Sequence, residues 1–304
     1  MGEFSPRSHF LRIAMPPEIF DTAGHILGRY DALVCDVWGV VHDGERAYPA
    51  AGEALARFRA GGGTVVLLSN SPMPSEAVIH VLDDKGVRRD SFDAIITSGD
   101  IARSYLQERR LIRVYHLGPE RDLALFEGTD LQRVSLEAAE VIVCTGFIDD
   151  RNHSGETYRP LLESALALDL KLVCANPDLV VDVGDERLPC AGTLAALYES
   201  IGGDVIWAGK PYAPAYQRVF NTIDRLRGET VSKNRILAIG DAIRTDIAGA
   251  AQAGIEAVFV TQGIHNDELM AHGKIMPERL KDFLEKESPE AISAIIAVMP
   301  ALAW

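Results

Sequence analysis

Short apolar segments that end abruptly at a polar residue or at glycine recur along the whole chain, and they constrain its fold more than any other feature. Their sequences are ALVCD, TVVLLSN, DAIITSG, IRVYHLG, VIVCTG, KLVCAN, VIWAGK, ILAIGD and AVFVTQG. Such nearly continuous hydrophobicity is typical of strands that are covered on both faces. Helical patterns such as AGEALARFRAGGG and TDIAGAAQAG lie between several of these segments. Strands that alternate with helices predict an α/β fold with a doubly wound parallel sheet.

The size and charge of the chain narrow its organisation and its partners. With 304 residues it is long for one compact core, so we expect a second domain. The formal net charge of −14 argues against nucleic acid or an anionic membrane as a partner, because both attract clustered Lys and Arg. No segment approaches the ~18 to 20 apolar residues of a membrane span, and the N-terminal residues lack a signal-peptide pattern. We therefore expect a cytoplasmic protein whose four cysteines are reduced and buried.

Polar side chains stand at the ends of four apolar segments, where ligands of parallel sheets bind. These residues are Asp36, Ser69 with Asn70, Lys210 and Asp241. Each of them alone is more often a turn or a helix cap than a functional group. Their coincidence at the ends of separate strands, expected in one sheet, favours a shared site. Carboxylates, a hydroxyl and an ammonium are the groups of a phosphoryl-transfer site.

Asp36 is the candidate nucleophile of such a site. A carboxylate that attacks phosphorus forms an aspartyl phosphate and divides one difficult displacement into two easier steps. Because the carboxylate and the phosphate are both anionic, a divalent cation must screen them, and Mg²⁺ takes oxygen ligands. We expect Asp36, Asp241 and a main-chain carbonyl to hold this ion.

The remaining polar residues are candidate phosphate ligands. The Ser69 hydroxyl, the main-chain N–H groups around Asn70 and the Lys210 ammonium would donate to the phosphoryl oxygens. Asp246, in the helical segment after Asp241, either orients Lys210 or caps its helix.

Four segments of the chain, taken in order, resemble the motifs of a known family. They are CDVWGVVHDG, which contains Asp36, then VVLLSNSP, WAGKPY, which contains Lys210, and GDAIRTDIAGA. Through these segments the chain resembles the haloacid dehalogenase-like (HAD) superfamily, and specifically its class IIA phosphatases. The resemblance extends from Tyr30 to Gly263. It implies a Rossmann-like core, an aspartyl-phosphate mechanism with Mg²⁺, and a metal contact from the main-chain carbonyl of Trp38.

The resemblance also implies an α/β cap domain inserted between the second and third motifs. We predict a core domain made of residues 1–107 and 204–304, and a cap domain at residues 108–203. Asn176 to Asp178, in the stretch ANPD, resemble an element of class IIA caps near the active site, and they also form a turn pattern. The resemblance leaves open whether Asn176 and Asp178 also contact the substrate. The stretch GDERLPCAG resembles the cap loop that faces the substrate.

Trp38 departs from the pattern of the HAD superfamily that the chain resembles. A carboxylate usually stands there, and it protonates the leaving oxygen and later activates water, which contributes about 10² to 10⁴ in rate. Three consequences stay open: turnover limited to leaving groups that need no proton, replacement of the acid by His42 or Asp43, or loss of catalysis. His42 and Asp43 also fit an ordinary hairpin turn with Gly44. The indole itself either walls off a substrate ring or fills space under the cap.

Two classes of function follow from these residues. The first is a Mg²⁺-dependent hydrolase that acts on a small phosphorylated metabolite. The second is a weakened or non-catalytic protein that binds phosphate esters on the same scaffold, as the tryptophan suggests. Chemistry at C–P or C–halogen bonds occurs on related folds, but the sequence carries no distinctive sign of it. Homo-oligomerisation through the cap or the core is compatible with the family.

Overall fold

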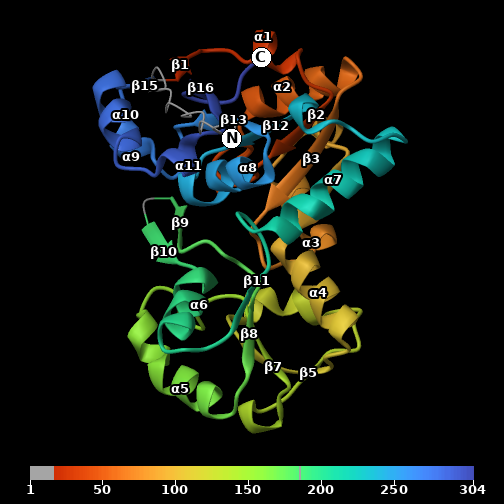
Figure 1. Cartoon of the computed structure of the whole chain (residues 1–304), viewed down its shortest axis with the longest axis vertical. Coiled ribbons are helices and arrows are strands. Elements are labelled where there is room, and N and C mark those ends of the chain that lie inside the picture. The colour runs from red at the N-terminus through yellow and green to blue at the C-terminus, as the bar shows by residue number, and fades with distance from the viewer. Residues whose placement is uncertain (1–16, 185) are drawn as a thin grey trace, which may run out of the picture.

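The predicted strands lie in two parallel sheets, which Figure 1 shows one above the other. The structure, a computed structural model, describes residues 17–184 and 186–304. The larger sheet contains β1 (Glu18–Ile19), β2 (Ala32–Cys35), β3 (Thr64–Ser69), β4 (Ala94–Thr97), β12 (Ile236–Gly240), β13 (Glu256–Val260) and β16 (Ile295–Met299). All its strands are parallel, in the order β1-β16-β13-β12-β2-β3-β4. This arrangement confirms the predicted α/β class.

Helices cover both faces of the larger sheet. Successive strand residues point to opposite faces, so that Val34 packs in one apolar cluster while Leu33 and Cys35 pack in the other. The Val34 side is covered by α4 (Ser98–Arg109), α7 (Ala213–Arg227), α8 (Ala248–Ala253) and α10 (Pro277–Leu284). The opposite side is covered by α1 (Gly24–Leu27), α2 (Pro49–Ala60) and α3 (Ser75–Asp84). Burial on both faces explains why these strands have no polar alternation.

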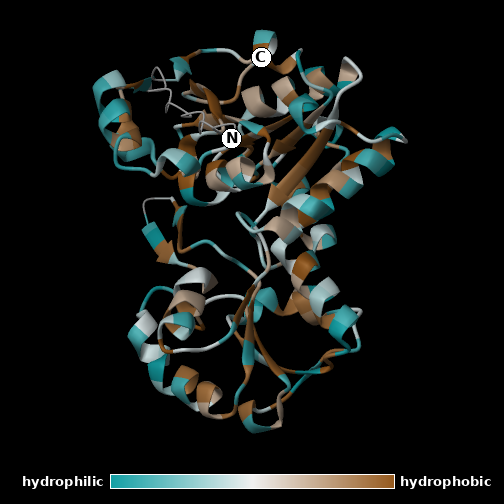
Figure 2. Ribbon diagram, viewed as in Figure 1, coloured by the Kyte–Doolittle hydropathy of each residue, from teal (hydrophilic) through white to brown (hydrophobic). Residues whose placement is uncertain are grey.

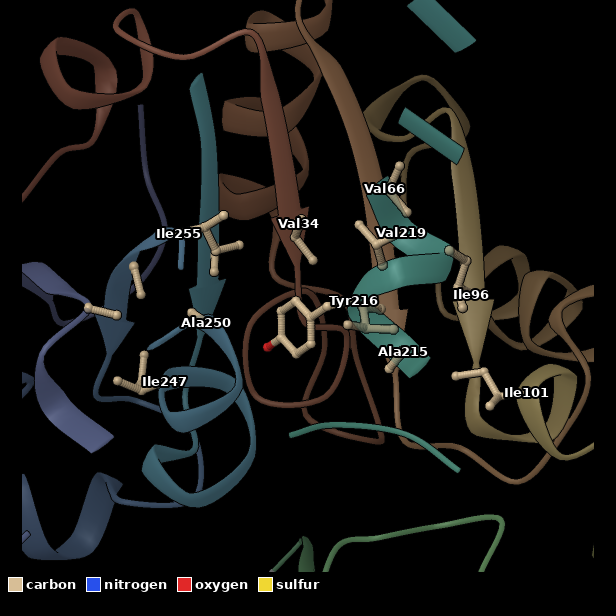
Figure 3. Close-up of a cluster of buried hydrophobic side chains, with 14 of the residues drawn as sticks. Val34, Val66, Ile96, Ile101, Ala215, Tyr216, Val219, Ile247, Ala250 and Ile255 are labelled. Atoms are coloured by element: carbon tan, nitrogen blue, oxygen red, sulfur yellow. The ribbon is translucent and has the colours of Figure 1, made fainter. Parts of the chain in front are cut away.

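Tyr216 connects the apolar core to the polar end of the sheet. Figure 3 shows its ring among Val34, Ala250 and the other side chains of the cluster. Its hydroxyl donates a hydrogen bond to the main-chain carbonyl of Asp246 at 3.1 Å. The backbone of Asp246 is thereby tied to α7.

The smaller sheet occupies the lower part of Figure 1. Its strands are β5 (Arg113–Leu117), β6 (Gln132–Arg133), β7 (Val141–Cys144), β8 (Lys171–Cys174) and β11 (Val205–Trp207). They are parallel, in the order β11-β8-β7-β5-β6. Two helices, α5 (Arg159–Ala167) and α6 (Ala191–Ser200), cover one face. On the other face, Val114, Val143 and Val173 belong to the same apolar cluster as Leu106 of α4.

One expectation about β11 is wrong. The segment that precedes Lys210 was expected in the same sheet as the strands that precede Asp36 and Asp241. Instead, Val205–Trp207 pairs in register with Leu172–Cys174 of β8. Lys210 therefore reaches the core on a loop that follows a strand of the smaller sheet.

The domain limits at residues 108 and 203 stay a prediction, and β11 lies beyond the second of them.

Several elements were not predicted. They include β16 and an antiparallel hairpin formed by β9 (Val180–Val183) and β10 (Glu186–Pro189), which lies between the two sheets in Figure 1. The shorter helices and strands are η1 (Arg89–Ser91), η2 (Glu120–Phe126), η3 (Leu136–Ala138), η4 (Gly155–Tyr158), η5 (Lys233–Arg235), the π-helical turn η6 (Ile243–Ile247), α9 (Asn266–Leu269), β14 (Met270–Ala271), β15 (Lys274–Ile275) and α11 (Pro289–Ile292).

The distribution of hydropathy follows this layering. Figure 2 colours most of the strands of the larger sheet as hydrophobic and shows hydrophilic residues mixed with hydrophobic ones on the surrounding helices. Among the residues that the structure describes, none of the helices has both the length and the apolar composition to cross a membrane.

Candidate active site

A pocket of about 1180 Å³ opens at the carboxyl ends of β2, β3 and β12, between the larger sheet and the β9–β10 hairpin. Asp36 follows β2, Ser69 ends β3 and Asp241 follows β12. These three residues line the pocket together with Lys210 and Asp246. Because parallel strands end at one edge, residues far apart in the sequence meet there.

Lys210 lies between two carboxylates at the base of this pocket. Its Nζ donates to Asp36 Oδ1 and, at 2.7 Å, to Asp246 Oδ1. All three side chains are buried. Asp246 also accepts the main-chain N–H of Ala242 at 3.2 Å, so it both orients the lysine and ties down the start of its own turn.

Asp241 is held by a neighbouring loop. Its Oδ2 accepts the main-chain N–H of Ile264 at 2.7 Å. Two glycines lie against the same carboxylate. A Cβ added to Gly39 would lie 2.1 Å from Asp241 Oδ2, and one added to Gly263 would lie 1.8 Å from it. Only residues without a side chain fit at these two positions.

Negative charge exceeds positive charge around the Lys210 ammonium. Burial, and next the Asp246 carboxylate, raise the pKa of Asp36 to about 7 although Lys210 acts to lower it. Burial and the carboxylates of Asp36 and Asp246 raise the pKa of Asp241 well above its ordinary value. Burial acts to lower the pKa of Lys210, but Asp246 and Asp36 hold it well above its ordinary value. The lysine is therefore a cation in an anionic pocket.

The donor set fits a hard divalent cation. Asp36, Asp241 and Asp246 each offer a carboxylate oxygen, and these oxygens lie within 4.8 Å of one another. Carboxylate oxygens are the ligands that Mg²⁺ prefers. The glycines beside Asp241 leave room around its carboxylate, and a bound cation would offset the excess negative charge. Asp246 has both oxygens engaged, Oδ1 with Lys210 and Oδ2 with the Ala242 N–H, whereas Asp36 and Asp241 each use one oxygen in these contacts and keep the other for an ion.

The residues after β3 join the core to the smaller sheet. Ser69 Oγ lines the pocket and accepts the main-chain N–H of Ser71 at 3.1 Å. Asn70 receives the main-chain N–H of Lys210 on its side-chain oxygen at 2.8 Å and donates to Asp178 Oδ1 at 2.9 Å. The structure thus places Asn70 as a brace between three segments.

Asn176 and Asp178 form the predicted turn and also line the pocket. Asn176 Oδ1 accepts the main-chain N–H of Asp178 at 3.1 Å. Burial raises the pKa of Asp178, although Lys210 and the amide of Asn70 act to lower it. Asp178 therefore contributes a further carboxyl group to the pocket lining.

Trp38 and its neighbours form the flap, which we define as residues 37–48. The Trp38 side chain is half-buried on the pocket wall. His42 is buried, and it is not among the described residues that line the pocket. Its Nδ1 accepts the main-chain N–H of Gly44 at 2.8 Å. Asp43 lines the pocket, but its Oδ1 accepts the main-chain N–H groups of Glu45 and Arg46 at 2.8 and 2.7 Å. Both residues serve the turn that the sequence pattern allowed.

Comparison with known proteins places this site in a family. A family model described as haloacid dehalogenase-like hydrolase matches residues 33–132, and one described as HAD-hydrolase-like matches residues 207–286. A solved haloacid dehalogenase-like hydrolase from Brucella suis 1330 is 36% identical, with a TM-score of 0.81, over 94% of this chain and 100% of that one. The chain belongs to the haloacid dehalogenase-like hydrolase family.

Curated relatives of this HAD hydrolase are more distant. Chronophin of Bos taurus is 26% identical over 262 residues, which cover 80% of this chain and 85% of chronophin. Ribonucleotide monophosphatase NagD of Escherichia coli K12 is 26% identical over 240 residues, which cover 76% of this chain and 88% of NagD. The expected family resemblance is confirmed.

Sequence reasoning missed several residues around the HAD site. Arg244 donates to the carbonyl of Pro177 at 2.7 Å, and Arg187 of β10 donates to the carbonyl of Ile264 at 3.1 Å. Gly263 follows the end of β13 and shapes the space around Asp241. Gly263, the glycine that ends the segment AVFVTQG, was a usable signal, because glycine permits close backbone approach. The arginines gave no such signal, since a charged side chain usually contacts solvent.

Proposed function

We propose that the chain is a Mg²⁺-dependent phosphatase of a small phosphorylated metabolite and that Asp36 carries an aspartyl phosphate during turnover. The observation that carries the proposal is Lys210, whose buried ammonium contacts both Asp36 and Asp246 beside the carboxylate of Asp241. A nucleophilic carboxylate, a cationic donor and a divalent-cation site are the requirements of phosphoryl transfer to an aspartate.

The first step transfers the phosphoryl group to the protein. A carboxylate oxygen of Asp36 forms a bond to phosphorus while the bond from phosphorus to the leaving oxygen breaks. The electron pair of that bond stays on the leaving oxygen. The Lys210 ammonium and the Ser69 hydroxyl donate to the phosphoryl oxygens, whose charge increases in the transition state.

The second step releases phosphate. The oxygen of a water molecule bonds to phosphorus, the bond to Asp36 breaks, and the carboxylate recovers its electron pair while the water proton passes to solvent. Asp246 holds Lys210 in place in both steps. When bound by Asp36, Asp241 and the main-chain carbonyl of Trp38, Mg²⁺ would offset the negative charge that the carboxylates and phosphate bring together.

The functions of two related proteins support the proposal. NagD of Escherichia coli is a ribonucleotide monophosphatase, and the relative YutF of Bacillus subtilis, 24% identical over 264 residues, is a 5'-nucleotidase. Both functions remove a phosphate from a small molecule. We propose the same class of substrate for this chain, with no nucleic-acid or membrane partner.

The test measures covalent chemistry at Asp36. Hydrolysis of p-nitrophenyl phosphate is followed with Mg²⁺ and after EDTA treatment, and beryllium fluoride, which mimics a phosphoryl group on a carboxylate, is used as a trap. We expect Mg²⁺-dependent turnover and a trapped complex, both lost in Asp36→Asn and kept in the control variant Asp130→Asn, which alters an exposed carboxylate outside the pocket lining.

A second candidate function is a binding protein without turnover, and Trp38 favours it because an indole cannot act as a general acid or base near neutral pH. A protein that binds Mg²⁺ yet gives neither trapping nor turnover across a panel of phosphate esters would reject the phosphatase and leave this alternative.

A further inference from the structure

The Trp38 side chain connects the segment that follows the nucleophile Asp36 with the β9–β10 hairpin. Its indole Nε1 donates to the main-chain carbonyl of Asp182 at 3.0 Å. Asp182 lies on β9, in the hairpin that covers the pocket, and Trp38 follows Asp36 by two positions. The side chain at the position of the usual proton carrier therefore contacts the hairpin.

The flap fixes the indole in this orientation. Gly44 has a φ of +91°, and a Cβ added to it would lie 2.4 Å from Trp38 Cζ2. The ring of His42 meets the indole edge-on, with 5.1 Å between the ring centroids. Lys85 donates to the carbonyl of Gly44 and holds the turn from the side of α3. The flap is thus shaped around the tryptophan, which indicates a built contact.

The hairpin has a second attachment across the pocket. Arg187 binds both carboxylate oxygens of Asp182 at 2.7 and 2.8 Å and also donates to the carbonyl of Ile264. The N–H of Ile264 in turn donates to Asp241. Asp182 is therefore held by Trp38 through its main chain and by Arg187 through its side chain. The hairpin spans the opening from the flap to the loop after β13.

This geometry leaves position 38 without a group for acid catalysis. The one polar hydrogen of the indole is already donated to Asp182. The neighbouring Asp43 carboxylate accepts two main-chain N–H groups, and Asp182 is paired with Arg187. A leaving oxygen next to Trp38 receives no proton from it.

We propose that Trp38 is a positioning residue that docks the β9–β10 hairpin over the pocket, and that the site consequently selects phosphates whose leaving group departs as a stable anion. Acyl phosphates, and aryl phosphates whose ring carries an electron-withdrawing substituent, are the chemical class that meets this condition. Asp36 forms its bond to phosphorus, the P–O bond breaks, and the leaving oxygen keeps the electron pair without taking a proton. The selection of substrates rests on the proposed function, whereas the docking does not.

The docking is tested by hydrogen exchange in the full-length protein. Trp38→Phe keeps an aromatic ring and removes the N–H donor. We expect peptides that cover residues 180–188 to exchange about fivefold faster in Trp38→Phe, as the loss of one hydrogen bond predicts. Peptides of β7 and β8 should be unchanged, and so should the hairpin in the matched control Trp304→Phe. Equal hairpin exchange in wild type and Trp38→Phe would overturn the docking.

The selection is tested with p-nitrophenyl phosphate and phenyl phosphate, which present a good and a poor leaving group on similar rings, and with acetyl phosphate. We expect wild type to hydrolyse acetyl and p-nitrophenyl phosphate and to discriminate strongly against phenyl phosphate. Trp38→Asp should raise kcat/KM for phenyl phosphate relative to p-nitrophenyl phosphate by about 10²-fold, because it restores an acid. Equal wild-type kcat/KM values for the two aryl phosphates would overturn the selection even if Trp38→Asp fails to fold.

The two ideas fail differently. Absence of turnover and of trapping with every compound rejects the phosphatase and the selection together, while the exchange experiment still decides whether Trp38 docks the hairpin. Turnover without discrimination keeps the phosphatase and rejects the selection.

Discussion

The hydroxyl of Tyr216 donates to the main-chain carbonyl of Asp246, so that the apolar core under the sheet supports the carboxylate that orients Lys210. Both residues are buried, and removing the hydroxyl would remove a buried hydrogen bond to the carbonyl. The stability of the core and the position of the lysine are therefore linked by one contact.

Tyr216→Phe should lower the free energy of unfolding by about 1 to 2 kcal/mol, because a buried hydrogen bond is lost. The measurement is urea denaturation. Tyr105→Phe is the matched control, since Tyr105 is half-buried on α4 beside Arg109. Equal changes in the free energy of unfolding of Tyr216→Phe and Tyr105→Phe would contradict a stabilising bond from Tyr216 to Asp246.

Asp241→Asn should abolish the stabilisation of the folded protein by Mg²⁺. In wild type, Mg²⁺ at 100 times its Kd should stabilise the fold by about 2.7 kcal/mol, seen as a rise in Tm. The substitution removes a ligand and also removes like-charge repulsion with Asp36 and Asp246, so the metal-free Tm should stay equal or rise. A metal-free Tm well below wild type, or an unchanged Mg²⁺ response, would contradict the role of Asp241.

Gly263→Ala should displace the Asp241 carboxylate, because the added Cβ would lie 1.8 Å from its Oδ2. We expect the rise in Tm with Mg²⁺ to shrink and turnover of p-nitrophenyl phosphate to fall at least about tenfold, as a site group moves out of place. Gly28→Ala is the control, because a Cβ there makes an ordinary contact at 3.7 Å. Full activity of Gly263→Ala would show that the pocket tolerates the methyl group.

Asp122→Asn should stabilise the protein at alkaline pH. Burial raises the pKa of Asp122 to about 6, although the Thr145 hydroxyl acts to lower it. The unfolded carboxyl has a pKa of about 3.9, so the folded state binds more protons between about pH 4 and 6, and stability falls with rising pH across that window. The amide avoids this penalty and should add about 2 to 3 kcal/mol at pH 8 and nothing near pH 4.

Urea denaturation at the two pH values measures this difference. The matched variant Asp130→Asn alters an exposed carboxylate and should give the same small change at both. A gain for Asp122→Asn at pH 4 as large as at pH 8 would refute the explanation by burial.

The parts of the site that follow strand ends could be read from the sequence. Asp36, Ser69 and Asp241 were predicted to meet because buried strands of one sheet end at one edge. Lys210 was assigned to the wrong sheet, since the segment VIW carries no mark of which sheet it joins. Strand β16 was missed because IIAVM runs into proline and has no polar or glycine residue at its end.

The contacts between the two units were beyond sequence reasoning. The bond from Trp38 to Asp182 and the bonds of Arg187 depend on the placement of a hairpin 144 residues away from Trp38. Residue type gives no information about such a distance: an indole that donates to a distant carbonyl and one that only fills space have the same letter in the sequence.

Helix α4 belongs structurally to both sheets, since Leu106 shares an apolar cluster with Val114, Val143 and Val173. An isolated fragment cut at residue 108 would leave these valines in water without the helix that covers them. Transfer of the smaller sheet and its helices to another protein would therefore require residues 98–109 in the transferred segment.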